Sequence, residues 1–125
     1  MDFKALEDRI KSKKSNFVDI DGFKFEITPV NQVDMMSIAI RCQKDKSLML
    51  EVEMILASIT NFKNITIKDI TNDFEEEDKD IEVPFTKFFL YEFLGRNEKI
   101  MVPLYEEINK KMTEYHSKHE EQKKT

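Results

Sequence analysis

The sequence predicts a mainly α-helical α+β fold, in which an N-terminal β-hairpin packs on a small bundle of four to five helices. Its composition favours helix over a sandwich or barrel, because the 125 residues include only 2 Gly and 3 Pro and 36% are charged. The apolar content of 40% can fill the core of one domain of ordinary size. A two-residue turn signal near the N-terminus, followed by apolar residues at helical spacing, indicates the hairpin and the bundle.

The hairpin is predicted over residues 16–27, with Asp21 and Gly22 at its turn. This turn needs positive φ angles, which Gly adopts at little cost. The register that the turn sets places the apolar residues of both strands on one face: Val18, Ile20, Phe23 and Phe25. Because an isolated hairpin is barely stable, we expect this face to cover helices.

Five helices are predicted, at residues 2–14, 32–43, 47–59 and 85–94 and in a last segment that ends near 115. Asn31 and Thr86 are suited to be N-caps, and Gly95 is suited to end the fourth helix. Asn97 is expected to cap the last helix, and Pro103 to mark its start or a kink. The second and third helices should form an antiparallel pair, since a short link joins them.

Each helix is expected to turn an apolar stripe inward. In the second helix the stripe consists of Val33, Met36 and Ile40, with Ile38 as a further candidate. In the third helix it consists of Leu48, Val52, Ile55 and Ile59, widened by Met49 and Leu56. In the last helix it consists of Met101, Leu104, Ile108, Met112 and Tyr115. The first helix, with Phe3, Leu6 and Ile10, must dock on another surface or fray, because so short a helix is marginal in water.

The chain divides into a short N-terminal helix at residues 1–15, a single hairpin-plus-helices domain at 16–115 and a polar flexible tail at 116–125. Within the domain, residues 71–83 carry many like charges, which repel one another. We expect this acidic segment to be a mobile, solvated loop. Residues 65–70, which precede it, are predicted to be either a brief strand or an extended segment.

The charge and the hydropathy pattern exclude several classes of partner. The net charge of −5 argues against nucleic acid, because a duplex-binding surface needs a basic cluster. The longest near-apolar stretch, residues 54–59, is too short to cross a bilayer, and the charged N-terminus does not resemble a secretory signal. The single cysteine, Cys42, excludes an internal disulfide and is expected to be buried or half-buried.

No motif for catalysis, a metal or a cofactor stands out. The sequence lacks a Gly-rich phosphate loop, G-x-S-x-G and H-E-x-x-H. His116 and His119 are three residues apart, but they lie in the polar tail without an obvious further ligand. We therefore expect no enzymatic activity, no catalytic residue, no metal and no cofactor. A small-molecule enzyme or regulator would need converging polar groups in a concave site around Cys42 or the histidines.

Residues 81–108 combine much aromatic surface with little reactive chemistry. On a helix, four of the rings gather on one side: Phe85, Phe88, Phe89 and Phe93. Tyr91 and Leu94 lie towards another side. One side can close the core, whereas the other needs a second layer, which is either another part of this chain or a partner.

The hairpin VDIDGFKFEITPV leads into two helices, a variable acidic stretch and the segment VPFTKFFLYEFL. This order resembles the small tail assembly chaperones of long-tailed bacteriophages. In that family a loose "vpFt/s" step opens a short helix, and four residues match it: Val83, Pro84, Phe85 and Thr86. Phe62 stands where members of the family often have a Trp. A baseplate-assembly protein of tailed phages has a similar layout and is the second resemblance.

The first resemblance implies a non-enzymatic chaperone that binds and solubilises the tape measure protein, or another tail protein, in the host cell cytoplasm during tail morphogenesis. Such a chaperone is not kept in the finished virion, and we expect it to self-associate without its client. Its client-binding surface is expected to expose five residues: Phe88, Tyr91, Leu94, Met101 and Tyr105. The alternative is a structural virion component, such as a baseplate or tail-completion protein, with a permanent place in purified particles.

Overall fold

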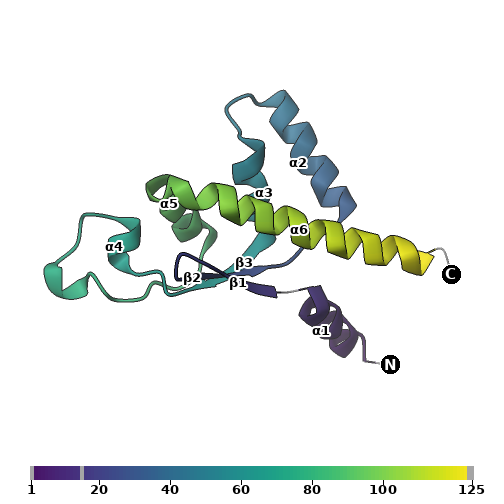
Figure 1. Cartoon of the computed structure of the whole chain (residues 1–125), viewed down its shortest axis with the longest axis horizontal. Coiled ribbons are helices and arrows are strands. Elements are labelled where there is room, and N and C mark those ends of the chain that lie inside the picture. The colour runs from purple at the N-terminus through teal and green to yellow at the C-terminus, as the bar shows by residue number, and fades with distance from the viewer. Residues whose placement is uncertain (1, 15, 124–125) are drawn as a thin grey trace.

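Helices and a three-stranded antiparallel sheet make up the part of the chain that the computed structural model describes, residues 2–14 and 16–123. The elements follow in the order α1 (Phe3–Lys14), β1 (Asn16–Ile20), β2 (Phe23–Ile27), α2 (Gln32–Lys44), α3 (Leu50–Ser58), β3 (Ile59–Lys63), α4 (Ile67–Ile70), the 3₁₀ turn η1 (Glu76–Asp78), α5 (Lys87–Arg96) and α6 (Glu98–Lys123). The predicted fold class, a hairpin with a helical bundle, is confirmed (Figure 1).

The hairpin has the predicted turn and register. Asp21 and Gly22 have φ angles of 52° and 86°, and the Gly22 amide donates to Asp19 Oδ1 at 3.1 Å. Ile20 lies opposite Phe23, and the strands continue in this register to their ends. Their shared apolar face is turned into the core, where Phe25 is fully buried.

A third strand, β3, lies beside β2 and was not predicted. Its first residue, Ile59, was predicted to be the last residue of a helix. Phe62 pairs with Phe25, and an irregularity in the ladder brings Ile59 opposite Ile27, so that all four side chains are buried. The segment predicted to be extended, residues 65–70, instead contains the short helix α4. A capping box explains the change, because the Asp69 carboxylate accepts hydrogen bonds from the Thr66 amide and hydroxyl at 2.8 and 2.9 Å.

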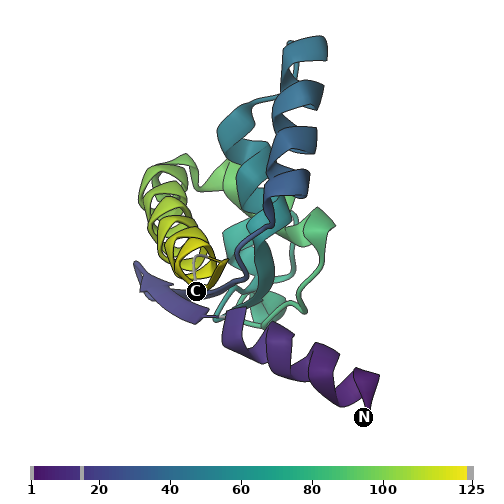
Figure 2. The ribbon, with the colours of Figure 1, turned by 90° about the vertical axis from the view of Figure 1, so that its right-hand side faces the viewer.

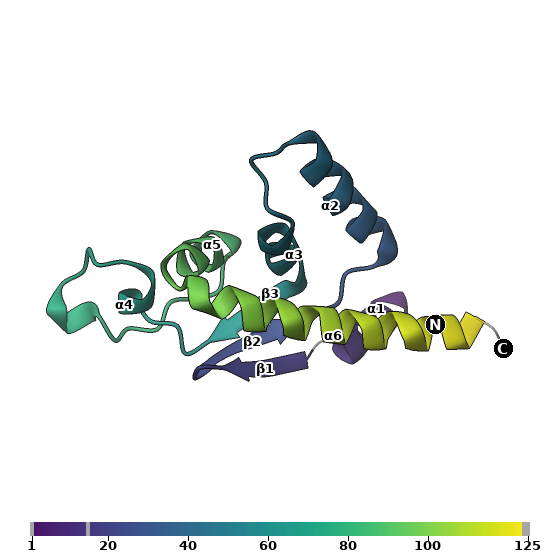
Figure 3. The same cartoon turned by 45° about the horizontal axis from the view of Figure 1, so that its top comes forward.

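The core lies between the apolar face of the sheet and helices α3, α5 and α6. Figure 3 shows the long helix α6 running over the hairpin, and α6 contacts both α3 and β1. The predicted stripe of α6 supplies three buried side chains, Leu104, Ile108 and Met112. Pro103 lies inside this helix and does not start it, and residues 116–123 of the predicted flexible tail continue it. The last two residues lie outside the described chain.

The inward face predicted for α2 is wrong. Asn31 is the N-cap as expected, since its Oδ1 accepts from the Asp34 amide at 2.8 Å. Val33, Met36 and Ile40, however, are 74%, 65% and 46% exposed. The helix packs through a second stripe, in which Ile38 is buried and Met35 and Cys42 are half-buried. Because α2 contacts α3 from the outer side of the molecule, its other face has no cover (Figure 2).

Two predicted helix ends also differ from the structure. Ser47 does not lead α3, because its amide and hydroxyl bind Asp45 Oδ1 at 3.0 and 2.6 Å in a turn before the helix; these bonds lower the pKa of Asp45. Gly95 lies within α5 and does not end it. Asn97 directly precedes α6 as expected, but its side chain also caps the end of α5, since its Nδ2 donates to the Phe93 and Asp69 carbonyls, each at 2.9 Å.

Candidate functional site

A groove of about 780 Å³ lies between α4, α5, the beginning of α3 and the beginning of α6. Its apolar lining consists of Met49, Val52, Ile70, Tyr91, Leu94 and Met101. Its charged lining consists of Glu92, Arg96 and Glu98. A concave, mostly apolar surface with charges at its border is suited to bind a side chain or a helix of another protein.

Helix α5 forms one wall of the groove and is held from its opposite side. The Thr86 hydroxyl accepts from the Phe89 amide at 3.0 Å and starts the helix, as predicted. Phe93 is fully buried, and its ring meets the ring of Phe23 edge-on with centroids 4.9 Å apart. Since this side of α5 is fixed in the core, the side that carries Phe88 and Tyr91 faces outward. These two rings are 65% and 57% exposed.

The structure brings together three of the five residues predicted to bind a client. Tyr91, Leu94 and Met101 line the groove. Phe88 lies one helical turn before Tyr91 on the exposed side of α5, outside the groove lining, and its ring contacts the ring of Phe89. Tyr105 is half-buried and packs against the core one turn after Met101.

The expected exposure of Leu94 is wrong, because this side chain is 2% exposed. Leu94 follows Leu90 by four residues, so the two lie on one line of α5 and are buried together. Phe88, by contrast, is exposed as expected, although helical geometry places it next to the line of Phe85, Phe89 and Phe93. The side of α5 that packs in the core therefore includes the two leucines and not only the line of phenylalanines.

Three apolar residues of the groove were not predicted to belong to it. Met49, which is 58% exposed, and Val52 were assigned to the inward stripe of the third helix. They line the groove because α3 begins at Leu50, so that Met49 is its N-cap and stands at the rim. Ile70 is the last residue of α4, whose helical turn was not predicted. The capping pattern from Thr66 to Asp69 was the signal that could have located it.

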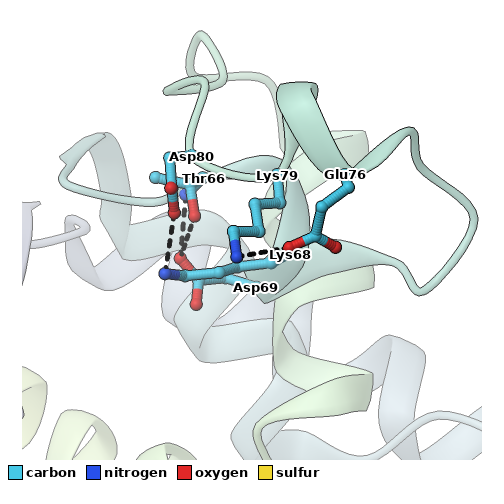
Figure 4. Close-up of polar contacts among 6 residues, drawn as sticks. All are labelled: Thr66, Lys68, Asp69, Glu76, Lys79 and Asp80. Atoms are coloured by element: carbon cyan, nitrogen blue, oxygen red, sulfur yellow. Dashed lines mark hydrogen bonds and ion pairs between the residues drawn. The ribbon is translucent and has the colours of Figure 1, made fainter.

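The acidic segment folds back onto α4 beside the groove (Figure 4). Lys68 Nζ lies 2.9 Å from Asp80 Oδ1, and Lys79 Nζ lies 2.5 Å from Glu76 Oε1. The backbone is tied as well, since the amides of Ile67 and Lys68 donate to carbonyls of the segment at 3.0 and 3.1 Å. These contacts attach the segment, which was predicted to be a mobile and solvated loop, to α4. Most of its carboxylates are nevertheless exposed to solvent.

The contacts of the acidic segment change the proton affinity of two side chains. The hydrogen bond from Lys68 lowers the pKa of Asp80 from its ordinary value of 3.8, and the same bond raises the pKa of Lys68. At the groove, Arg96 Nη2 donates to Asn72 Oδ1, which joins the acidic segment to the end of α5. Arg96 at the groove and the two lysines of the adjoining segment thus have partners from the same chain.

The described residues contain no group of three or more His, Cys, Asp or Glu placed to hold a metal ion. Cys42 is half-buried as expected and lies on α2, away from the groove lining. His116 is half-buried beside the Tyr115 ring, with centroids 5.3 Å apart, and the side chain of His119 lies outside the described ones. The groove itself offers apolar contact and three charged side chains, which suits recognition of another chain.

Two further apolar surfaces lie outside the groove. One is the stripe of α1, where Phe3, Leu6 and Ile10 are 75%, 37% and 46% exposed. The other is the uncovered stripe of α2. It lines a shallow hollow of about 470 Å³ together with Ser37 and Arg41. The chain thus exposes apolar stripes on α1 and α2 in addition to the rings on α5.

Among the described helices, none is long and apolar enough to cross a membrane. No protein-family model, no curated protein and no solved structure matches this chain.

Proposed function

We propose that this protein is a non-enzymatic chaperone of phage tail assembly, which binds the tape measure protein and keeps it soluble in the host cytoplasm until the tail forms. The observation that carries the proposal is the exposed apolar surface formed by Phe88, Tyr91 and the adjoining groove. An exposed apolar patch with a charged border is typical of a protein-binding surface.

The shape of this surface supports an extended or helical client. The groove is open and is lined by residues at or in four helices, and a helical client can lay its own apolar face into such a groove. Met49 and Met101 both line it, and Met side chains repack easily around clients of different sequence.

The charges of the chain support a role in keeping a complex soluble. The net charge is −5, and the acidic segment lies next to the groove through its contacts with α4 and Arg96. Glu92 and Glu98 in the groove can pair with basic side chains of a client. Free acidic side chains around a bound client also oppose association between complexes.

The identity of the client comes from the resemblance to tail assembly chaperones. The step at residues 83–86 that carries the resemblance leads directly into α5, the helix that presents Phe88 and Tyr91. The proposed client is accordingly a long, mainly helical tail protein with apolar faces that are covered only in the assembled tail.

Co-expression of the full chain with a tape measure protein tests the proposal. We expect the client to move into the soluble fraction and to copurify with this protein. The double variant Phe88→Ser and Tyr91→Ser should lose most of this effect, whereas Val102→Ser should keep it. Val102 is a matched control because it is 64% exposed on α6 and lies outside the groove. If the double variant solubilises the client as well as the unchanged chain does, the surface is not the binding site.

Mass spectrometry of purified virions separates the proposal from the structural alternative. A chaperone should be absent from finished particles, or present far below one copy per tail. A fixed number of copies in each particle would instead identify a baseplate or tail-completion protein.

A further inference from the structure

Helix α1 projects from the body of the molecule (Figure 2), and its apolar stripe is exposed. Every side chain from Asp2 to Lys11 is exposed, including Phe3, Leu6 and Ile10. A helix of 12 residues whose apolar stripe is exposed is marginal in water, because most helical stability in proteins comes from packing of an amphipathic face. The helix therefore needs a surface that covers its stripe.

The uncovered stripe of α2 matches the stripe of α1 in length and spacing. Val33, Met36 and Ile40 follow the spacing i, i+3, i+7, and so do the three residues of the α1 stripe. The helices have 12 and 13 residues, which makes both of them roughly 20 Å long. Two apolar stripes of this spacing can pack side by side over two turns.

The charges on the two helices favour one direction of packing. At the start of α1 Asp2 is balanced by Lys4, whereas the end of the helix is basic, beginning with Arg9 in its second half. In α2 the acidic residue Asp34 lies in the first turn, and Arg41 and Lys44 lie in the last turn. An antiparallel arrangement places the basic end of α1 beside Asp34, whereas a parallel arrangement places it beside the basic end of α2. It also aligns the two helix dipoles favourably.

Helix α1 cannot cover α2 of its own chain. Only residue 15 separates the end of α1 from the start of β1, so α1 is held close to the hairpin. Figure 2 shows α1 below the sheet and α2 extending above it on the far side of the molecule. The α2 that α1 can cover belongs to another molecule.

We propose that two copies of this chain exchange α1, so that the α1 stripe of each copy packs antiparallel on the α2 stripe of the other in a two-fold dimer. A two-fold arrangement covers both stripes in both copies with the same contact made twice. In this contact Leu6 lies at the centre of one stripe and Met36 at the centre of the other. The dimer contact does not involve the groove or α5, so a test of the dimer does not depend on the proposed client binding.

The mass of the purified full chain in solution, measured by sedimentation or light scattering without a client, tests the dimer. We expect a dimer that dissociates on dilution. Leu6→Glu and Met36→Glu should each raise its dissociation constant roughly tenfold or more, because each places a charge at the centre of the contact. Val102→Glu adds the same charge on the exposed side of α6 and should leave the dimer unchanged. Circular dichroism should show that each variant stays folded.

Other outcomes would overturn the exchange. A monomer at all concentrations would do so, as would a series of larger species that grows with concentration. A dimer that resists Met36→Glu but not Leu6→Glu would show that α1 packs on α1, and the reverse result would show that α2 packs on α2.

A charge reversal tests the direction of packing. Arg9→Glu and Asp34→Arg should each weaken the dimer, and the two changes together should restore it. If the double variant is no stronger than the weaker single variant, the antiparallel arrangement is wrong.

Discussion

The Lys87 ammonium donates a hydrogen bond to the Ile59 carbonyl oxygen at 2.6 Å and a second one to the Leu56 carbonyl. Both carbonyls belong to the last turn of α3 and its C-cap, where a helix has no further amides to satisfy them. A cation at this end also interacts favourably with the helix dipole. The first residue of α5 thus caps the C-terminal end of α3 and links these two helices.

Replacing Lys87 by Met should therefore destabilise the domain. It leaves two helix-end carbonyls without their donor, and we expect the free energy of unfolding to fall by about 1–2 kcal/mol. Urea unfolding followed by circular dichroism measures this change. Lys110→Met, on an exposed position of α6, is the matched control and should change stability by less than about 0.5 kcal/mol. Equal effects at the two positions would show that the hydrogen bonds do not stabilise the fold.

The same lysine predicts a dependence of stability on alkaline pH. Burial of the ammonium lowers the pKa of Lys87 from its ordinary value of 10.5. In the range between the lowered pKa and 10.5, the unfolded chain binds more protons at this residue than the folded chain, so its contribution to stability rises with pH. The difference in unfolding free energy between the unchanged chain and Lys87→Met should accordingly grow over this range. A difference that shrinks would contradict the assigned direction.

The ion pair between Lys68 and Asp80 predicts a local opening in acid. Because the folded-state pKa of Asp80 is lowered, its contribution is present above the ordinary value of 3.8 and is lost as the pH falls through the folded value. We expect the Ile67 and Lys68 amides, which donate to the acidic segment, to exchange hydrogen faster below about pH 3 than near neutral pH, relative to core amides. Asp80→Asn should speed their exchange already near neutral pH. Glu77→Gln, at an exposed position, should not.

The two faces of α5 predict opposite outcomes for two phenylalanines. Phe93→Ala should lower the free energy of unfolding by about 3–5 kcal/mol, because it leaves a cavity between α5 and the sheet. Phe88→Ala removes a ring that is 65% exposed and should change stability by less than about 1 kcal/mol. Chemical unfolding of the two variants measures the contrast. A large loss for Phe88→Ala would mean that this ring is buried in solution, which would also remove it from the proposed client surface.

The hydroxyl of Ser58 predicts a substitution that does not destabilise the fold. Ser58 is fully buried at the end of α3, and its Oγ has no hydrogen-bond partner among the described residues. A buried hydroxyl without a partner costs about 1–3 kcal/mol, so Ser58→Ala should leave the melting temperature unchanged or raise it. Ser58→Val is the steric control, because it adds volume to a packed site and should lower the melting temperature. A clear loss of stability in Ser58→Ala would show that the hydroxyl has a partner, such as water.

Local sequence signals predicted the parts of the fold that depend on neighbouring residues. The Asp21-Gly22 turn determined the register of the hairpin, because only residues with easy positive φ angles suit that turn. Asn31 and Thr86 were recognised as N-caps because a short polar side chain satisfies the free amides of a helix start. The prediction failed at Ile59, where two local signals compete. Ile59 continues the helical stripe of α3, but a β-branched residue also suits a strand. Pairing with β2 stabilises the strand at this position.

The choice of faces could not be predicted in the same way. Helix α2 has two apolar stripes of identical spacing, Val33–Met36–Ile40 and Met35–Ile38–Cys42, so periodicity alone does not say which one packs on α3. On α5, Leu94 was expected to be exposed but is buried, because α5 packs against the sheet and α6 at once. The groove combines residues from four helices, and its lining depends on where each helix begins relative to the others.

The sequence by itself determined that this protein is a helical domain with an N-terminal hairpin, where its turn and two of its helix starts lie, and which stripe of α6 enters the core. These features depend on local backbone preferences and on apolar spacing within one element. Only the tertiary structure decided that a third strand joins the hairpin, that Phe88 and Tyr91 face outward while Leu94 is buried, and that the stripes of α1 and α2 remain uncovered. Burial depends on how much apolar surface the neighbouring elements present, and that quantity exists only once the elements are packed together.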